Sequence, residues 1–143
     1  MSESPLSERL ARLGKALGER EAEHRDALAE AWRRAQSLRS EVSRALDAFA
    51  VAAARAGAPQ ISVRLGDART DDKHIRSVEF DITRGRHRAI VTVKARGEVT
   101  LVGPFHAGKV EGPCKTFPYA AEGELAGALG DFLEKFLEEA ATP

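Results

Sequence analysis

The sequence predicts an α+β fold: a long N-terminal helix, a four-stranded antiparallel β-meander, and an amphipathic C-terminal helix packed on the sheet. Three observations lead to this prediction. Residues 6–56 contain no proline and repeat their apolar side chains at helical spacing. The middle of the chain alternates apolar and polar side chains, and residues 120–140 return to helical spacing. We expect residues 1–58 to form a long helix that serves for packing and oligomerisation, and residues 59–143 to form a single compact unit.

The N-terminal helix has clear start and stop signals. Ser4 is a good N-cap and Pro5 suits the first helical position, whereas Gly57 followed by Pro59 is typical of a helix end. A continuous helix between these points would have about 52 residues and a length of about 78 Å, more than the width of a domain of this size. The alternative is two helices with a break near Gly18, although no proline or turn cluster favours that break.

The apolar stripe of this helix falls into two parts. Residues 28–52 carry enough apolar side chains to pack on a sheet, whereas residues 19–26 are polar. The first part consists of four leucines at spacings of four, three and four: Leu6, Leu10, Leu13 and Leu17. In a continuous helix they would project beyond the domain and need a partner. The sequence therefore predicts a homo-oligomer, most simply a dimer through a short coiled coil. The helix orientation stays open, because Arg20 and His24 interrupt a longer heptad seam.

Period-two alternation predicts the strands and their register. Alternation over residues 61–65 predicts the first strand. A two-residue turn that begins at Gly85 pairs Phe80 with Val91, so that the apolar side chains of both strands share one face. A three-residue loop that ends at Gly97 continues the same apolar face onto the fourth strand.

The C-terminal part of the chain contains one irregular segment and one regular segment. Residues 103–118 hold three glycines and three prolines, so we expect an ordered loop that includes a short hairpin around Ala107 and Gly108. Residues 120–140 have the spacing of an amphipathic helix. Its apolar face should cover the apolar face of the sheet through residues that include Leu129, Phe132 and Phe136.

Composition excludes several classes of protein. The single cysteine, Cys114, excludes an intramolecular disulfide framework and a cysteine-rich zinc site. No apolar run approaches the roughly 18 residues that span a membrane, and the N-terminus lacks the apolar core of a signal peptide. We therefore expect a cytoplasmic protein without a membrane partner. No motif in the sequence indicates a metal ion or a cofactor.

A basic hairpin is the candidate site for a polyanion. Five cations lie on or near the two strands that flank Gly85 and could follow a phosphate backbone: Arg64, Arg84, Arg86, Arg88 and Lys94. Aromatic side chains that would stack on bases are not interleaved with these cations, which weakens the case for nucleic acid.

The glycine- and proline-rich segment is the candidate site for a small ligand or for catalysis. Residues 103–109 match the spacing of a phosphate-binding loop, but Val110 stands where a magnesium-binding Ser or Thr is needed. His106, Lys109 and Cys114 are the reactive side chains of this segment. A Cys–His nucleophile pair needs a close geometry that sequence cannot establish.

Three functions remain open on these observations. The first is a non-enzymatic interaction or assembly protein that is oligomeric through its N-terminal helix. The second is a binder of nucleic acid or another polyanion through the basic hairpin. The third is a small enzyme or ligand-binding protein that uses residues 103–118. We expect no catalytic residues, and so we favour the first.

Overall fold

The computed structural model describes residues 4–71, 76–108 and 112–141. Its strands build one antiparallel sheet of six strands, in the order β1-β3-β4-β5-β6, with β2 also paired to β3. The α+β fold is confirmed, but the predicted count of four strands is wrong. The elements in chain order are α1 (Pro5–Arg55), β1 (Arg64–Leu65), β2 (Arg69–Thr70), β3 (Ser77–Arg84), β4 (His87–Lys94), β5 (Glu98–His106), β6 (Cys114–Pro118) and α2 (Glu122–Ala141).

Of the two additional strands, β6 lies in the segment expected to be an ordered loop, and β2 lies in a segment for which the sequence predicts no strand. β2 pairs Arg69 with Glu79. With two residues, this strand is too short to show an alternating pattern. β6 pairs with β5 from Glu98 to Val102, so the glycine- and proline-rich segment does contain a hairpin, but a longer one than the short hairpin expected around Ala107 and Gly108. The first strand is also shorter than predicted, since only Arg64 and Leu65 pair with β3. The extents of β1, β2 and β6 are thus set by their pairing with a neighbouring strand, which the alternation of apolar residues in their own sequence does not reveal.

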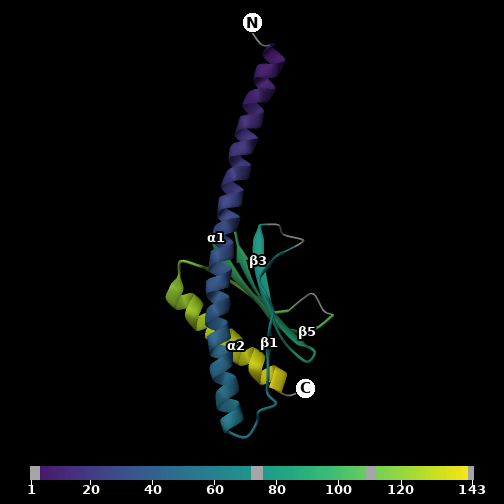
Figure 1. The fold of residues 1–143 in the computed structure, drawn as a ribbon, viewed down its shortest axis with the longest axis vertical. Helices are drawn as coiled ribbons and strands as arrows, with labels where there is room; N and C mark the ends of the chain where they lie inside the picture. The colour runs from purple at the N-terminus through teal and green to yellow at the C-terminus, as the bar shows by residue number, and fades with distance from the viewer. Residues whose placement is uncertain (1–3, 72–75, 109–111, 142–143) are drawn as a thin grey trace.

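The first helix is continuous, so the alternative with a break near Gly18 is wrong. The backbone N–H of Ser7 donates to Oγ of Ser4 (3.1 Å), which confirms the predicted N-cap. The helix then runs without interruption for 51 residues, and Gly57 follows its end with φ 102°. Figure 1 shows the N-terminal half of α1 standing clear of the sheet and of α2.

The predicted register of the meander is confirmed. Phe80 pairs with Val91 across β3 and β4, and Val93 pairs with Val99 across β4 and β5. Both turns are made by a glycine in the left-handed region: Gly85 with φ 58° and Gly97 with φ 97°. Turn chemistry and the apolar pattern specify the same pairing, and this agreement fixes which side chains enter the core.

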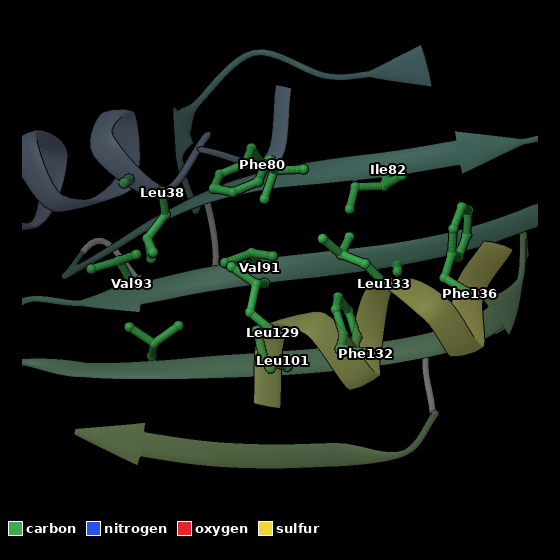
Figure 2. Close-up of a cluster of buried hydrophobic side chains, with 14 of the residues drawn as sticks. Leu38, Phe80, Ile82, Val91, Val93, Leu101, Leu129, Phe132, Leu133 and Phe136 are labelled. Atoms are coloured by element: carbon green, nitrogen blue, oxygen red, sulfur yellow. The ribbon is translucent and has the colours of Figure 1, made fainter. Parts of the chain in front are cut away.

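One face of the sheet is covered by two helical segments that together close the core. The C-terminal half of α1 packs on β3 and β4, whereas α2 packs on β4, β5 and β6. Figure 2 shows Leu38 of α1 beside Phe80, and shows Leu129, Phe132 and Phe136 of α2 over the same layer. The predicted cover by α2 is confirmed, and α1 supplies the other half of it. The side chains with no more than 2 % exposure include Phe80, Phe136, Ile82, Val42 and Val91.

Candidate functional site

The part of α1 that lies before the core carries the largest exposed apolar side chains. We call residues 5–27 the arm, because Leu28 is the first leucine of α1 that packs against the core. Four leucines of the arm are among the most exposed large hydrophobic residues of the described chain: Leu6 (65 %), Leu10 (58 %), Leu13 (53 %) and Leu17 (46 %). The leucines that the sequence indicated as an oligomer contact therefore lie together on a helix surface that no other described element covers.

Just beyond the arm, α1 carries a cluster of charged side chains, one of which contacts Tyr119 after β6. Arg33 donates a hydrogen bond to Glu30, and Arg34 forms an ion pair with the same carboxylate (3.4 Å). The hydrogen bond from Arg33 is the main cause that holds the pKa of Glu30 below its usual value. The guanidinium of Arg34 also lies over the ring of Tyr119, 4.7 Å from its centroid. Of these contacts, the one between Arg34 and Tyr119 joins α1 to the segment between β6 and α2.

Arg84, one of the five cations of the basic hairpin, is bound inside the fold. Its Nε donates to the carbonyl oxygen of Ala140 (3.1 Å) in the last turn of α2. Its Nη1 donates to the carbonyl oxygen of Ser62 (2.9 Å) in the segment before β1. The side chain therefore joins three separate parts of the chain, and its Nε and Nη1 are occupied by backbone carbonyl oxygens.

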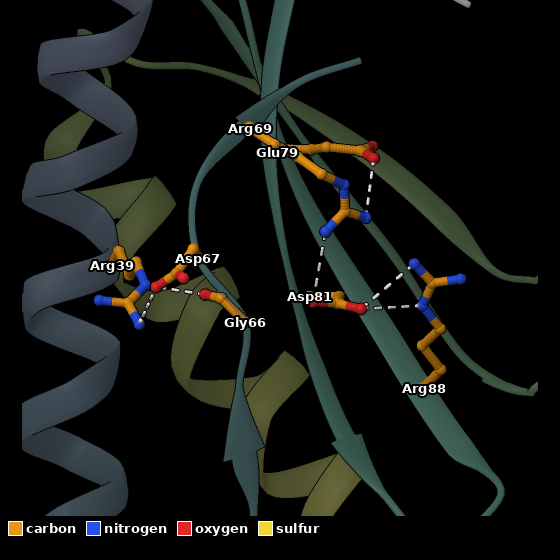
Figure 3. A network of polar contacts seen from close by, with 7 residues as sticks. All are labelled: Arg39, Gly66, Asp67, Arg69, Glu79, Asp81 and Arg88. Carbon is orange, nitrogen blue, oxygen red and sulfur yellow. Dashed lines mark hydrogen bonds and ion pairs between the residues drawn. The ribbon is translucent and has the colours of Figure 1, made fainter. Parts of the chain in front are cut away.

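Arg88 is also held by an internal partner, within a network on the face of the sheet away from the helices. Its guanidinium contacts Oδ2 of Asp81, with both Nε and Nη2 at 3.2 Å. Arg69 of β2 contacts the other oxygen of Asp81 (3.6 Å) and also Glu79 (3.0 Å). Figure 3 shows these two arginines on either side of Asp81. The network joins β2, β3 and β4 by alternating charges.

The remaining cations of the hairpin do not converge on one site. Arg64 is exposed in β1 and Arg86 is exposed in the turn between β3 and β4. Lys94 lines an open groove of about 750 Å³ on the face of the sheet away from the helices, together with Arg76 and Arg96. The floor of this groove includes Ile90, Thr92, Thr100 and Val102. The five predicted cations are thus spread over both faces and one turn of the sheet.

The candidate loop site is also dispersed. The His106 ring lies against His87 in an edge-to-face contact, with ring centroids 5.0 Å apart. Cys114 is exposed at the start of β6, where it pairs with Val102 and lines a pocket of about 490 Å³ between β6 and α2. His106 does not line that pocket. Lys109, the third residue of the predicted site, lies outside the described residues. The histidine and the thiol are therefore not brought together.

Sequence reasoning missed two arginines that hold the segment around β1 and β2 in place. Arg39 of α1 donates to the carbonyl oxygen of Gly66 (2.8 Å) and forms an ion pair with Asp67 (3.4 Å) (Figure 3). Arg69 binds Glu79 and Asp81 as described above. The Arg88–Asp81 pair had a visible signal, because the predicted register places these residues diagonally on one face. The Arg39 contact had none, since it depends on how α1 is rotated on the sheet.

Several other chemistries find no support in the described part of the chain. No group of three or more His, Cys, Asp or Glu side chains there could hold a metal ion. Neither described helix is both long and apolar enough to cross a membrane. Comparison of the chain with protein-family models, with curated proteins and with solved structures finds no match in any of the three.

Proposed function

We propose that this protein is a non-enzymatic assembly protein, and that its arm joins two copies of the chain into a dimer. One observation carries the proposal: four leucines of the arm lie exposed in a single stripe on a continuous helix. Continuity matters because a straight α1 cannot fold the arm back over its own sheet. The leucines must then either stay in water or meet another chain.

Leaving this stripe in water is unfavourable. Full burial of a leucine side chain is worth roughly 1.5–3 kcal/mol. Monomeric proteins scatter exposed apolar residues singly, and a continuous patch usually marks an interaction surface. In addition, a helix of about 23 residues without tertiary contacts is only marginally stable in water. Pairing would bury the leucines and would stabilise the arm as a helix.

A second copy is the simplest partner for such a stripe. Closed pairs of identical chains are the commonest oligomers, and they use the same patch on both subunits. The four leucines follow the alternating spacing of a coiled-coil seam, which suits them to a second helix of the same kind. The polyanion alternative has less support, since Arg84 and Arg88 already have internal partners.

Light scattering on the full-length chain over a concentration series, from about 1 µM to several hundred micromolar, tests the proposal. We expect twice the mass of one chain at the upper concentrations. The double variant Leu10→Gln/Leu13→Gln should remain monomeric, because glutamine keeps helix propensity and removes the apolar contact. Val51→Gln is the matched control, since Val51 is 49 % exposed on the same helix but outside the arm.

Two results would overturn the proposal. One is a wild-type chain that stays monomeric at every concentration. The other is a double variant that dimerises as well as the wild type. Circular dichroism of each variant shows whether the helix content is intact, so that a loss of dimer is not mistaken for a loss of fold.

A further inference from the structure

The leucine stripe of the arm lies on the same side of α1 as the residues that pack on the sheet. Eighteen residues are five turns of an α-helix with 3.6 residues per turn, so positions 18 apart share one face. Ala31 follows Leu13 by 18 residues, and Ala35 follows Leu17 by 18. Both alanines are buried against the sheet. The same holds over ten turns for Leu10 and the buried Leu46.

We propose that two arms pair antiparallel, with Leu6 beside the partner's Leu17 and Leu10 beside the partner's Leu13. This inference rests on the proposed function, since it describes how the proposed dimer is built. It is carried by two observations: the shared face just described, and the order in which the four leucines follow one another.

The shared face excludes a straight parallel pair. A second helix bound to the leucines lies on the side of α1 where, further along the helix, the sheet begins. In a parallel pair, both helices would continue into that region, and the two sheets would occupy the same space. Figure 1 shows the sheet and α2 confined to the C-terminal half of α1. In an antiparallel pair, each folded unit lies beyond the free end of the partner's arm, so the units point away from each other.

The spacing of the leucines selects one antiparallel register. The spacings of four, three and four read the same in both chain directions, so the stripe is complementary to itself about its midpoint. Every leucine then opposes a leucine of the partner. A shift of one heptad would place Leu6 opposite the partner's His24 and Leu10 opposite the partner's Arg20. In the selected register the partner's Pro5 lies level with Gly18, about ten residues or 15 Å before Leu28, the first leucine of α1 that packs against the core. The partner's helix therefore does not meet the sheet.

Cysteine cross-linking in a Cys114→Ser background tests orientation and register together. Two variants, one with Leu6→Cys and one with Leu17→Cys, are prepared separately. A third sample is an equimolar mixture of the two that is refolded from denaturant. After light scattering confirms the dimer, each sample is oxidised. We expect disulfide-linked dimers in the mixture only, in up to about half of the pairs if subunits assort at random. Glu8→Cys mixed with Lys15→Cys is the matched control. In the selected register these two positions also lie level with each other, but they face away from the stripe and should not cross-link.

Small-angle X-ray scattering on the unaltered chain gives a second measurement that no substitution can disturb. Two helices of 51 residues that overlap through residues 5–18 give a maximum dimension of roughly 130 Å, whereas a side-by-side parallel pair gives roughly 80 Å. Efficient cross-linking of Leu6→Cys or Leu17→Cys alone, or a dimer of about 80 Å, would overturn the antiparallel arrangement and leave the assembly function standing. A monomer in all samples would instead overturn the proposed function itself.

Discussion

The two halves of α1 have one apolar stripe but meet very different surroundings. In the C-terminal half, the buried stripe combines the small residues Ala31, Ala35 and Val42 with Leu38 and Leu46. In the arm, the stripe consists of four leucines, and it is exposed. The presence of leucines on a stripe therefore does not by itself decide whether the stripe is buried.

The difference follows from what each half has to fit. Large side chains on the sheet, including Phe80 and Val93, already fill the space beneath the C-terminal half. Small residues on the helix let it approach that layer closely at native packing density. Between two helices no sheet fills the gap, and leucines are the size that suits a helix–helix seam. The sizes of the side chains therefore indicate the kind of surface that each half opposes.

The largest expected effect is on the sheet beneath the C-terminal half. Phe80→Ala should lower the free energy of unfolding by about 3–5 kcal/mol, because it leaves a cavity under α1 where the side chain is fully buried. Urea unfolding followed by circular dichroism measures it. Phe117→Ala, at the half-exposed edge strand β6, should cost clearly less. An equal loss of unfolding free energy in Phe80→Ala and Phe117→Ala would mean that the core is not centred where the structure places it.

A matched pair on α1 sharpens the contrast between its two halves. Leu38→Ala should lower the free energy of unfolding by about 2–5 kcal/mol at any protein concentration, because Leu38 is buried on the sheet. Leu10→Ala should leave unfolding of the dilute chain almost unchanged and should lower the melting temperature only at concentrations where dimers form. Differential scanning calorimetry at two concentrations separates these cases. A concentration-independent loss for Leu10→Ala would show that the arm packs within its own chain.

Gly66, which receives the hydrogen bond from Arg39 of the C-terminal half, should also be sensitive. A Cβ added there would overlap Oδ1 of Asp81, which contacts Arg69. We expect Gly66→Ala to cost about 1–3 kcal/mol in urea unfolding, as overpacking typically does. Gly14→Ala, in the open arm, meets nothing within 4 Å and should instead stabilise the helix slightly. A neutral Gly66→Ala would mean that Asp81 can leave its arginines freely.

The smallest expected effect lies where the arm joins the folded unit. The folded-state pKa of Glu30 is lowered, chiefly by the hydrogen bond from Arg33. Its contribution to stability is therefore present above the ordinary glutamate pKa of the unfolded chain and is lost as the pH falls through the folded-state pKa. Glu30→Gln should therefore lower the melting temperature slightly at pH 7 and not at pH 2. Glu23→Gln on the exposed arm is the control. A difference that grows on acidification would contradict the assigned contact.

The parts of the fold that sequence predicted are those set by local chemistry. Gly85 and Gly97 fixed two turns, and the turns fixed the register of Phe80 and its neighbours. The end signals at Ser4 and Gly57 likewise bounded α1. Local patterns of this kind can be recognised in the sequence without knowing which segments pack against each other.

What could not be predicted depends on contacts between distant segments. Two residues of β2 pair with β3 only because the intervening chain returns to that edge, and the roles of Arg39 and Arg84 depend on where α1 and α2 come to rest. The basic hairpin is an example: the sequence suggests that Arg84 and Arg88 are available to bind a polyanion, whereas both have partners within the fold. The four leucines lie exposed together on one helix, as their spacing predicts, whereas the described residues of the other two candidate sites do not converge.

The bond from Arg84 to Ala140 has a consequence for the electrostatics of α2. The last turn of that helix contains no basic residue, although the C-terminal end of a helix carries a partial negative charge from its unpaired carbonyl groups. Arg84 supplies the missing positive charge from the end of β3. The helix therefore has its C-terminal dipole compensated only when the β3–β4 hairpin is formed. The final turn of α2 should become ordered together with the sheet and not before it.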